Sequence, residues 1–457
     1  MSEVVALAPT GMLASGFLPT SFAEGMRRRP HFIGQDSGST DGGPDALGCG
    51  KPHFSRSAYK RDLELMLRGA REAKIPLLIG SAGSCGSDGA VEFIADIIRE
   101  IAREHGLHFK LALIRAEQGK EYLQKKLKAG RIKPLWPSGP LTPETIARAE
   151  HVVGMMGAEP FIAALDAGAE VVLAGRSSDT SIFASYLTRA GIDPGIAWHA
   201  AKILECGAAC VVQRRNPDCM LAVVRDDHFI VEPTSPELRC SPQSVASHTL
   251  YENGDPFHLL EPAGMLDTEF ARYEAVSDRA VKVSGSRFKP AKQYTVKLEA
   301  AEKAGYQSLV IGGIRDPFII QQLDAWLAGL RDRIIERVHN IYAGKVEEKD
   351  YTLYFRVYGR DGVMGPLEPE KEIRGHEVGL LIEVTAAAPE MATAIAKSVS
   401  HLAAHHPIPQ WSGLITGVAF PYGLTAIDRG LVYRFSMHHV VEVDDPLEMF
   451  RTELLTI

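Results

Sequence analysis

The chain has 457 residues, of which 45% are hydrophobic and 23% are charged, and its formal net charge is −7. This length exceeds one ordinary hydrophobic core, so we expect two or three domains. Lys and Arg form no extended stripe, which argues against a nucleic-acid partner. No apolar window reaches the roughly 20 residues that span a bilayer. The N-terminus also lacks a signal-peptide pattern, so we expect a cytoplasmic protein with no membrane partner.

The first 210 residues alternate between short apolar runs and amphipathic segments. Apolar runs of this length between helices are typical of buried parallel strands joined by right-handed βαβ connections. The pattern therefore predicts a parallel-sheet, Rossmann-like α/β domain over residues 1–285. The expected strands are 4–8, 31–34, 75–79, 109–114 and 170–174, and the expected helices are 56–74, 90–105, 119–129, 159–167 and 181–190, with another beginning at Thr142.

The sequence changes character after this region. Residues 218–233 read as a hairpin with Arg225, Asp226 and Asp227 at its turn. Residues 234–290 are rich in Pro, Ser and Gly, and we expect a connector with few regular elements.

The C-terminal part, residues 286–457, has a β-α-β-β-α-β order. That order predicts a ferredoxin-like α+β domain. The expected strands are 308–312, 351–358, 378–385 and 431–441, the expected helices are 318–342 and 389–405, and an extra strand is expected at Leu414–Phe420.

Three loops rich in Gly, Ser and Asp follow expected strands of the first domain. They are residues 35–43, 80–88 and 175–180. Ligands of open parallel sheets bind at the carboxyl ends of the strands. The second and third loops lead into helices, whose N-termini favour a carboxylate or a phosphate. Arg176 adds a bidentate donor for the same kind of group.

These loops predict a site for a small anionic substrate. The candidate substrate-binding residues are Ser39, Thr40, Ser81, Ser84, Arg176, Ser177 and Asp179. The alternative is purely structural, because Ser87, Asp88, Asp179 and Thr180 are also good helix caps.

Three carboxylates are the candidates for proton transfer. Asp36 and Asp41 lie in the first loop, and Glu205 lies beside Cys206 near an expected helix end. Carboxyl groups that are buried or close to one another acquire shifted pKa values suited to acid–base work. Asp36 and Asp41 are equally suited to holding a divalent metal ion, so a metal cofactor stays open.

Several segments resemble the acyclic terpene utilisation family. They are Thr10-Gly11-Met12, residues 36–41, 79–83, 175–179, 202–207 and 247–252, and Val283-Ser284-Gly285-Ser286-Arg287. The resemblance covers almost the whole chain. It implies a role in the breakdown of acyclic terpenes, in which the intermediates are CoA thioesters. It also implies a ferredoxin-like C-terminal region, which some members receive from a separate small protein.

The leading hypothesis is a lyase or hydratase that acts on a small carboxylate or its CoA thioester in a catabolic pathway. Asp36 or Asp41 would abstract a proton, and backbone donors would stabilise the developing negative charge. The alternatives are an acyl or CoA transferase with Ser84, Cys85 or Glu205 as nucleophile, and a non-catalytic ligand-binding subunit of a larger complex. We expect a homo-oligomer, with a small partner subunit left open.

Overall fold

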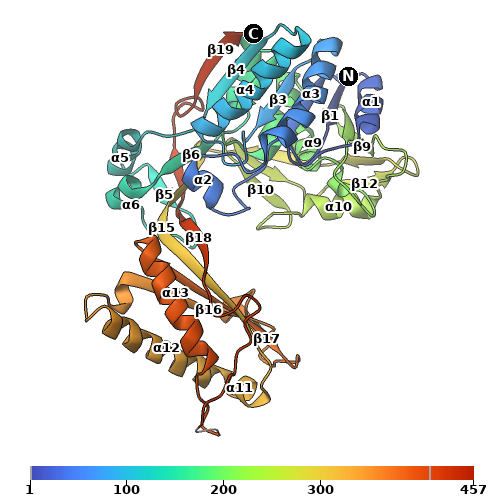
Figure 1. The fold of residues 1–457 in the computed structure, drawn as a ribbon. Coiled ribbons are helices and arrows are strands. Elements are labelled where there is room, and N and C mark those ends of the chain that lie inside the picture. Colours follow the sequence, from blue (N-terminus) through green and yellow to red (C-terminus); the bar gives the residue numbers. More distant parts are fainter. Residues whose placement is uncertain (1–2, 411–412) are drawn as a thin grey trace. The chain divides into compact units, whose positions relative to one another are not determined.

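The computed structural model describes residues 3–410 and 413–457. The chain folds into two compact units, which are residues 1–302 with 435–457, and residues 303–434. Both are mixed α/β (Figure 1). The chain passes from the first unit to the second within strand β15 (Thr295–Ile314) and returns within β18 (Ile427–Glu442).

A ten-stranded sheet organises the first unit, in the order β12-β13-β9-β8-β1-β2-β3-β7-β4-β19. The central strands of this order, β1, β2, β3, β7 and β4, are mutually parallel. Their flanking strands β8, β9, β13, β12 and β19 are antiparallel. The strands are β1 (Val4–Ala8), β2 (Phe32–Asp36), β3 (Leu77–Gly80), β4 (Lys110–Arg115), β7 (Val171–Ala174), β8 (Met220–Val224), β9 (His228–Pro233), β12 (Arg272–Ala275), β13 (Val281–Ser284) and β19 (Arg451–Thr456).

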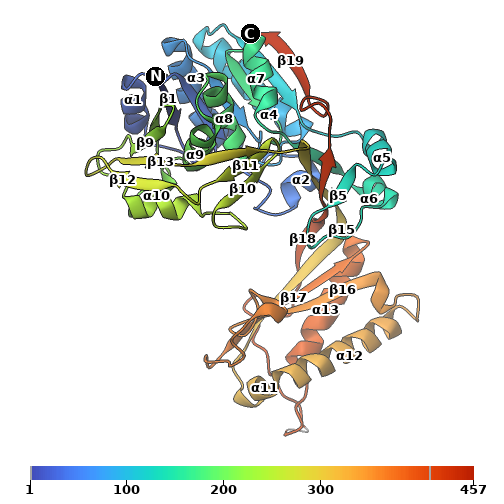
Figure 2. The same cartoon turned by 180° about the vertical axis from the view of Figure 1, so that it is seen from behind.

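Helices cover both faces of this sheet. Leu77 and Ile79 of β3 belong to one apolar cluster with residues of α3 and α4, whereas Leu78 belongs to another with residues of α8 and α9. Figures 1 and 2 show α3 and α4 on one side of the sheet and α8 and α9 on the other. Successive side chains of a strand point to opposite faces, so uninterrupted apolar strands require helices on both sides. The helices of this unit are α1 (Pro19–Arg27), α2 (Asp45–Cys49), α3 (Arg56–Ala73), α4 (Asp88–His105), α5 (Lys120–Lys128), α6 (Pro143–Arg148), α7 (Glu159–Asp166), α8 (Asp179–Arg189), α9 (Pro194–Leu204) and α10 (Pro242–Thr249).

The strand register brings the three predicted loops to one edge of the sheet. Asp36 of β2 pairs with Gly80 of β3, and Ile79 pairs with Leu173 of β7. The strands therefore end at about the same level, and the loops that follow them begin side by side.

The expected connector over residues 234–290 is wrong, because this region is largely regular. It contains α10 and five strands, of which β12 and β13 extend the main sheet. A separate antiparallel sheet has the order β10-β11-β14, with β10 at His258–Glu261, β11 at Gly264–Asp267 and β14 at Arg287–Pro290. These strands are only four residues long, and frequent Pro, Ser and Gly hid them from a pattern search.

The remaining strands form a sheet in the order β16-β17-β15-β18-β5, and β6 also pairs with β15. Their bounds are β5 (Ile132–Pro134), β6 (His151–Met155), β16 (Tyr351–Tyr358) and β17 (Val378–Ala386). Within the second unit, α12 (Leu323–Ile341) and α13 (Pro389–Ala404) pack on one face of this sheet (Figure 2).

Two sequence predictions for the second unit are wrong in detail. The helix expected over 318–342 is divided at Gln322 into α11 (Pro317–Gln321) and α12. The strand expected at Leu414–Phe420 is irregular, with one isolated bridge between Ala419 and Gly313. A single bridge leaves the rest of that segment without the ladder that a strand requires.

Candidate active site

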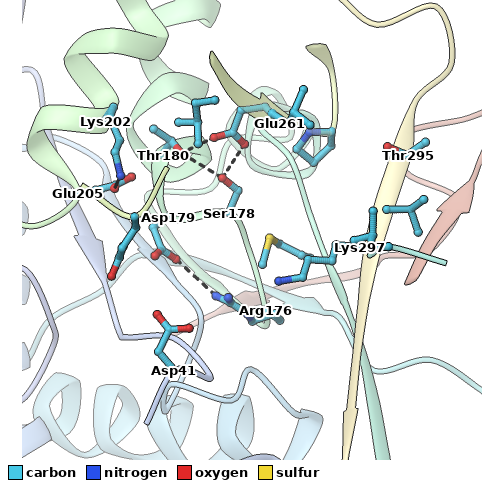
Figure 3. Close-up of a pocket in the computed structure, with 17 residues that line it drawn as sticks. Asp41, Arg176, Ser178, Asp179, Thr180, Lys202, Glu205, Glu261, Thr295 and Lys297 are labelled. Carbon is cyan, nitrogen blue, oxygen red and sulfur yellow. Dashed lines mark hydrogen bonds and ion pairs between the residues drawn. The ribbon is translucent and has the colours of Figure 1, made fainter. Parts of the chain in front are cut away.

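A cavity of about 720 Å³ opens at the carboxyl ends of the parallel strands of the first unit (Figure 3). Five acidic and three basic side chains line it, together with apolar residues on another part of its wall. The lining residues are Asp41, Leu135, Met155, Arg176, Ser178, Asp179, Thr180, Lys202, Glu205, Glu252, Leu259, Leu260, Glu261, Pro262, Thr295, Lys297 and Val440.

Arg176 is fixed at the wall of this cavity by the chain's own acceptors. Its Nε donates to Glu299 Oε2 at 2.8 Å, and its Nη1 donates to Ser81 Oγ at 3.0 Å. Nη1 also lies 3.4 Å from Asp179 Oδ1. Within the described residues Nη2 has no hydrogen-bond partner, so this one nitrogen remains for a ligand. The sequence had suggested that Arg176 would bind an anion through two nitrogens at once.

Glu299 balances the positive charge at this end of the cavity. Lys297 Nζ lies 2.9 Å from its Oε1, and Thr40 Oγ1 donates to its Oε2 at 3.2 Å. Burial alone would raise the pKa of Glu299, but Arg176 and Lys297 outweigh burial and hold this pKa at about 2. Glu299 is therefore ionised at neutral pH.

The N-terminus of α8 is also occupied by a carboxyl group of the chain. Glu261 of β10 accepts a hydrogen bond from Ser178 Oγ at 2.6 Å and another from Thr180 Oγ1. Burial raises the pKa of Glu261 to about 7, although both hydroxyl groups act in the opposite direction. This carboxyl group can therefore change its protonation state near neutral pH.

At the second loop, away from the cavity, a carboxylate of the chain also lies at a helix N-terminus, that of α4. Ser87 Oγ accepts from Ala90 N as the N-cap of α4, and Asp88 N donates to Glu117 Oε2 at 3.0 Å. Glu117 in turn pairs with His151 Nδ1 at 2.6 Å. The chain's own carboxylate thus takes the position where the sequence suggested an external anion.

Glu205 lies in the cavity beside Lys202 and Asp179 (Figure 3). Lys202 Nζ donates to Glu205 Oε1 at 2.6 Å, and both side chains are almost fully buried. Burial raises the pKa of Glu205 to about 8, Asp179 adds to this rise, and Lys202 opposes it. Burial likewise raises the pKa of Asp179 to about 6 against the pull of Arg176. Two neighbouring carboxyl groups therefore titrate on opposite sides of neutrality.

Asp36 and Asp41 are separated by the fold. Asp41 lines the cavity, whereas Asp36 is 4% exposed and is not one of the lining residues. Asp36 Oδ2 accepts from Gly38 N at 2.8 Å, and Oδ1 has no hydrogen-bond partner among the described residues. Burial, reinforced by Asp179, raises the pKa of Asp36 well above its usual value. Within residues 3–410 and 413–457, no three His, Cys, Asp or Glu side chains are grouped to hold a metal ion.

The other predicted substrate-binding residues serve the loops themselves. Ser84 Oγ donates to Ser37 O at 3.0 Å, and Ser81 Oγ accepts from Ser177 N at 3.4 Å. Thr40 holds Glu299, and Ser39 Oγ accepts from Asp41 N at 3.2 Å. Of the predicted set, Asp41, Arg176, Asp179 and Glu205 reach the cavity.

Sequence reasoning missed Glu261, Lys297 and Glu299 as site residues. Lys297 and Glu299 alternate with apolar Val296 and Leu298, so a strand reading would have placed both on one face. Glu261 lies in the segment taken for a connector, and no local pattern marks it.

Together these features define a mixed α/β protein with a cavity of titratable carboxyl groups at the carboxyl ends of its parallel strands. The chain belongs to the acyclic terpene utilisation family. The model of that family, described as acyclic terpene utilisation family protein AtuA, matches residues 50–212 and 220–441, which confirms the resemblance seen in the sequence. No curated protein and no solved structure matches the chain. Among the helices of the described residues, none is long and apolar enough to cross a membrane.

Proposed function

We propose that the protein is a lyase or hydratase that acts on a small carboxylate or its CoA thioester in a catabolic pathway. The observation that carries the proposal is the pair Asp179 and Glu205. Burial raises both pKa values, to about 6 and about 8, in one cavity. Elimination of water, or its addition to a double bond, needs a base and an acid in one site. A pair of carboxyl groups with separated pKa values supplies both at neutral pH.

The roles follow from the protonation states at pH 7. Asp179 is mostly ionised and acts as the general base that removes the proton next to the carbonyl group. Glu205 is mostly protonated and acts as the general acid that donates its proton to the departing hydroxyl group. Lys202, which donates to Glu205 Oε1, keeps that carboxyl group oriented. In the hydration direction the same two groups exchange roles.

The cavity has two chemically different walls, which suit a substrate with a charged head and an apolar body. Lys297 Nζ and Arg176 Nη2 are the cationic groups available to a carboxylate or thioester oxygen. The apolar wall consists of Leu135, Met155, Leu259, Leu260, Pro262 and Val440. Apolar surface that holds the body of a ligand, with polar groups placed to orient its head, is typical of small-molecule sites.

The transferase alternative receives less support. Ser84 and Cys85 are buried outside the cavity lining, so neither presents a nucleophile to a ligand there. Glu205 remains the one predicted nucleophile in the cavity. A covalent adduct on Glu205, trapped with an acyl-CoA and detected by mass spectrometry, would favour transfer over elimination.

We also interpret the two units as a Rossmann-like and a ferredoxin-like domain. Support comes from the βαβ connections of the first unit and from the strand order β16-β17-β15-β18 of the second, whose elements run β-α-β-β-α-β. A cytoplasmic location belongs to the same proposal, and the six free cysteines suit a reducing compartment.

The test is turnover of a panel of hydroxy acids and 3-hydroxyacyl-CoA thioesters, with formation of the enoyl product followed by absorbance. Asp179→Asn and Glu205→Gln should each lower kcat by about 10²–10⁴, the usual contribution of one acid or base. Asp278→Asn, at an exposed position, is the matched control and should leave turnover unchanged. Full activity in both cavity variants would refute the assignment.

A further inference from the structure

A second cavity, of about 480 Å³, lies in the first unit at the loop that follows β1. Its walls come from three segments that resemble the family, residues 10–12, 202–207 and 247–252, and from Ser15 and residues 209–217. The proposed reaction gives none of the residues that line this cavity a role. The lining residues are Gly11, Met12, Ser15, Cys206, Ala209, Arg214, Pro217, His248 and Tyr251.

His248 is the buried polar group of this cavity. The residue is 7% exposed, and its Nε2 has no hydrogen-bond partner among the described residues. The imidazole stacks on Tyr251, with ring centroids 5.6 Å apart and an interplanar angle of 16°. A buried nitrogen without a partner costs free energy, and a ligand that bonds to it recovers that cost.

The charged groups that line the second cavity indicate the charge of its ligand. Burial lowers the pKa of His248 to about 4, and Lys202 and Arg214 add to this effect, so the imidazole is neutral at pH 7. Arg214 is then the one formal charge among the lining residues. A single guanidinium matches a single negative charge, and its planar fork fits a carboxylate.

Apolar side chains complete the walls. Met12, Ala209 and Pro217 present carbon and sulfur surface beside the polar groups. We propose that this second cavity binds a monocarboxylate with a short apolar chain, held by Arg214 and His248 and covered by Met12, Ala209 and Pro217.

The second cavity shares two segments with the candidate active site. Cys206 lines the second cavity, and the preceding residue, Glu205, lines the first. Likewise, Tyr251 lines the second cavity and the next residue, Glu252, lines the first. Lys202 Nζ lies 5.8 Å from the centroid of the Tyr251 ring. A ligand in the second cavity therefore contacts Cys206 and Tyr251, the chain neighbours of two residues that line the first cavity. Any energetic coupling between the two sites is reciprocal. The binding site itself does not depend on the proposed reaction.

The test is calorimetric titration of the full-length protein with butanoate in a buffer free of other carboxylates and of phosphate. We expect Arg214→Gln to weaken butanoate binding at least about tenfold, which corresponds to about 1.4 kcal/mol. Arg215→Gln is the matched control, because Arg215 is exposed and belongs to neither cavity lining. His248→Phe keeps the aromatic stack, removes both ring nitrogens and should weaken binding by a similar factor.

Binding in the two cavities is separated by Lys297→Gln, which alters the first cavity alone. Butanoate affinity that survives Lys297→Gln and falls in Arg214→Gln supports the proposal. Affinity that falls in Lys297→Gln and survives Arg214→Gln places the carboxylate in the first cavity and overturns it. Inorganic phosphate that binds more tightly than butanoate overturns the carboxylate assignment, and no heat from either probe overturns the site.

Discussion

Arg176 and Glu299 form an ion pair across the first unit, with Arg176 Nε 2.8 Å from Glu299 Oε2 and both side chains about 95% buried. The two residues are 123 positions apart in the chain. The pair fixes the third loop against β15 and places the Arg176 guanidinium at the wall of the candidate active site. A buried pair of this kind matters most when one partner is removed.

Replacing Glu299 by Gln should therefore destabilise the protein. The variant leaves the buried Arg176 guanidinium with only the longer, 3.4 Å contact to Asp179 as an ion pair. Breaking a buried pair costs about 3–5 kcal/mol. Urea unfolding followed by circular dichroism measures the change. Asp444→Asn, which removes one partner of the exposed pair with Arg131, is the control and should shift the midpoint little. Equal midpoints for both variants would show that the buried pair is not a strong constraint.

Gly86 has no side chain, and this lets the backbones of the second and third loops come into contact. Its φ is +64°, and an added Cβ would lie 2.1 Å from the backbone nitrogen of Arg176. Gly86→Ala should therefore shift the third loop, lower stability by about 3 kcal/mol or more, and reduce ligand binding in the cavity.

Gly106 provides the matched comparison for this substitution. Its φ is +59°, and nothing lies within 4 Å of an added Cβ. Gly106→Ala should cost about 1–2 kcal/mol, because it adds left-handed strain without a clash. Thermal unfolding of the two variants measures the difference, and equal losses would mean that the contact with Arg176 yields easily.

The positions of the three loops were predictable from sequence, and their partners were not. Short apolar runs such as residues 75–79 mark buried strands, and the loop after each strand must lie at one sheet edge. Glu261 and Glu299 come from strands 80 or more residues downstream of the loops they contact, and pairing at that separation leaves no periodic signal. Three apparent anion sites were thus already filled by Glu299, Glu261 and Glu117.

The sequence also could not show that Asp41 reaches the cavity and that Asp36 does not. Asp36 is the last residue of β2 and is held beneath the loop by Gly38, whereas Asp41 lies five residues further on, at the cavity. Spacing along a glycine-rich loop does not reveal which carboxylate faces inward, because glycine lets the backbone turn either way. Glu205 was identified from its place near a helix end, which the structure puts just after α9.

Glu261 should make stability depend on pH. Its pKa is raised from 4.5 to about 7 in the folded protein, so the unfolded chain loses this proton first as pH rises. The contribution of Glu261 is fully present below pH 4.5 and is lost by pH 7, a change of about 3 kcal/mol. Gln does not titrate, so the melting temperature of Glu261→Gln relative to the wild type should rise between pH 5 and pH 8. The exposed variant Glu269→Gln should show no such trend, and a constant difference for Glu261→Gln would place its pKa near the ordinary value.

The pH dependence of turnover tests the acid and base roles separately. The base Asp179 must be ionised, so kcat/KM should rise with pH through about 6, and the acid Glu205 must be protonated, so it should fall through about 8. These apparent pKa values belong to the interacting pair, and removing one carboxyl group also changes the other. Glu205→Gln should lose the descending limb, while the residual activity of Asp179→Asn should lose the ascending limb. Because Asp179 raises the pKa of Glu205, the descending limb of Asp179→Asn should also move to lower pH. A profile in which the descending limb stays near 8 in that variant would mean that Asp179 does not raise the pKa of the group responsible for this limb.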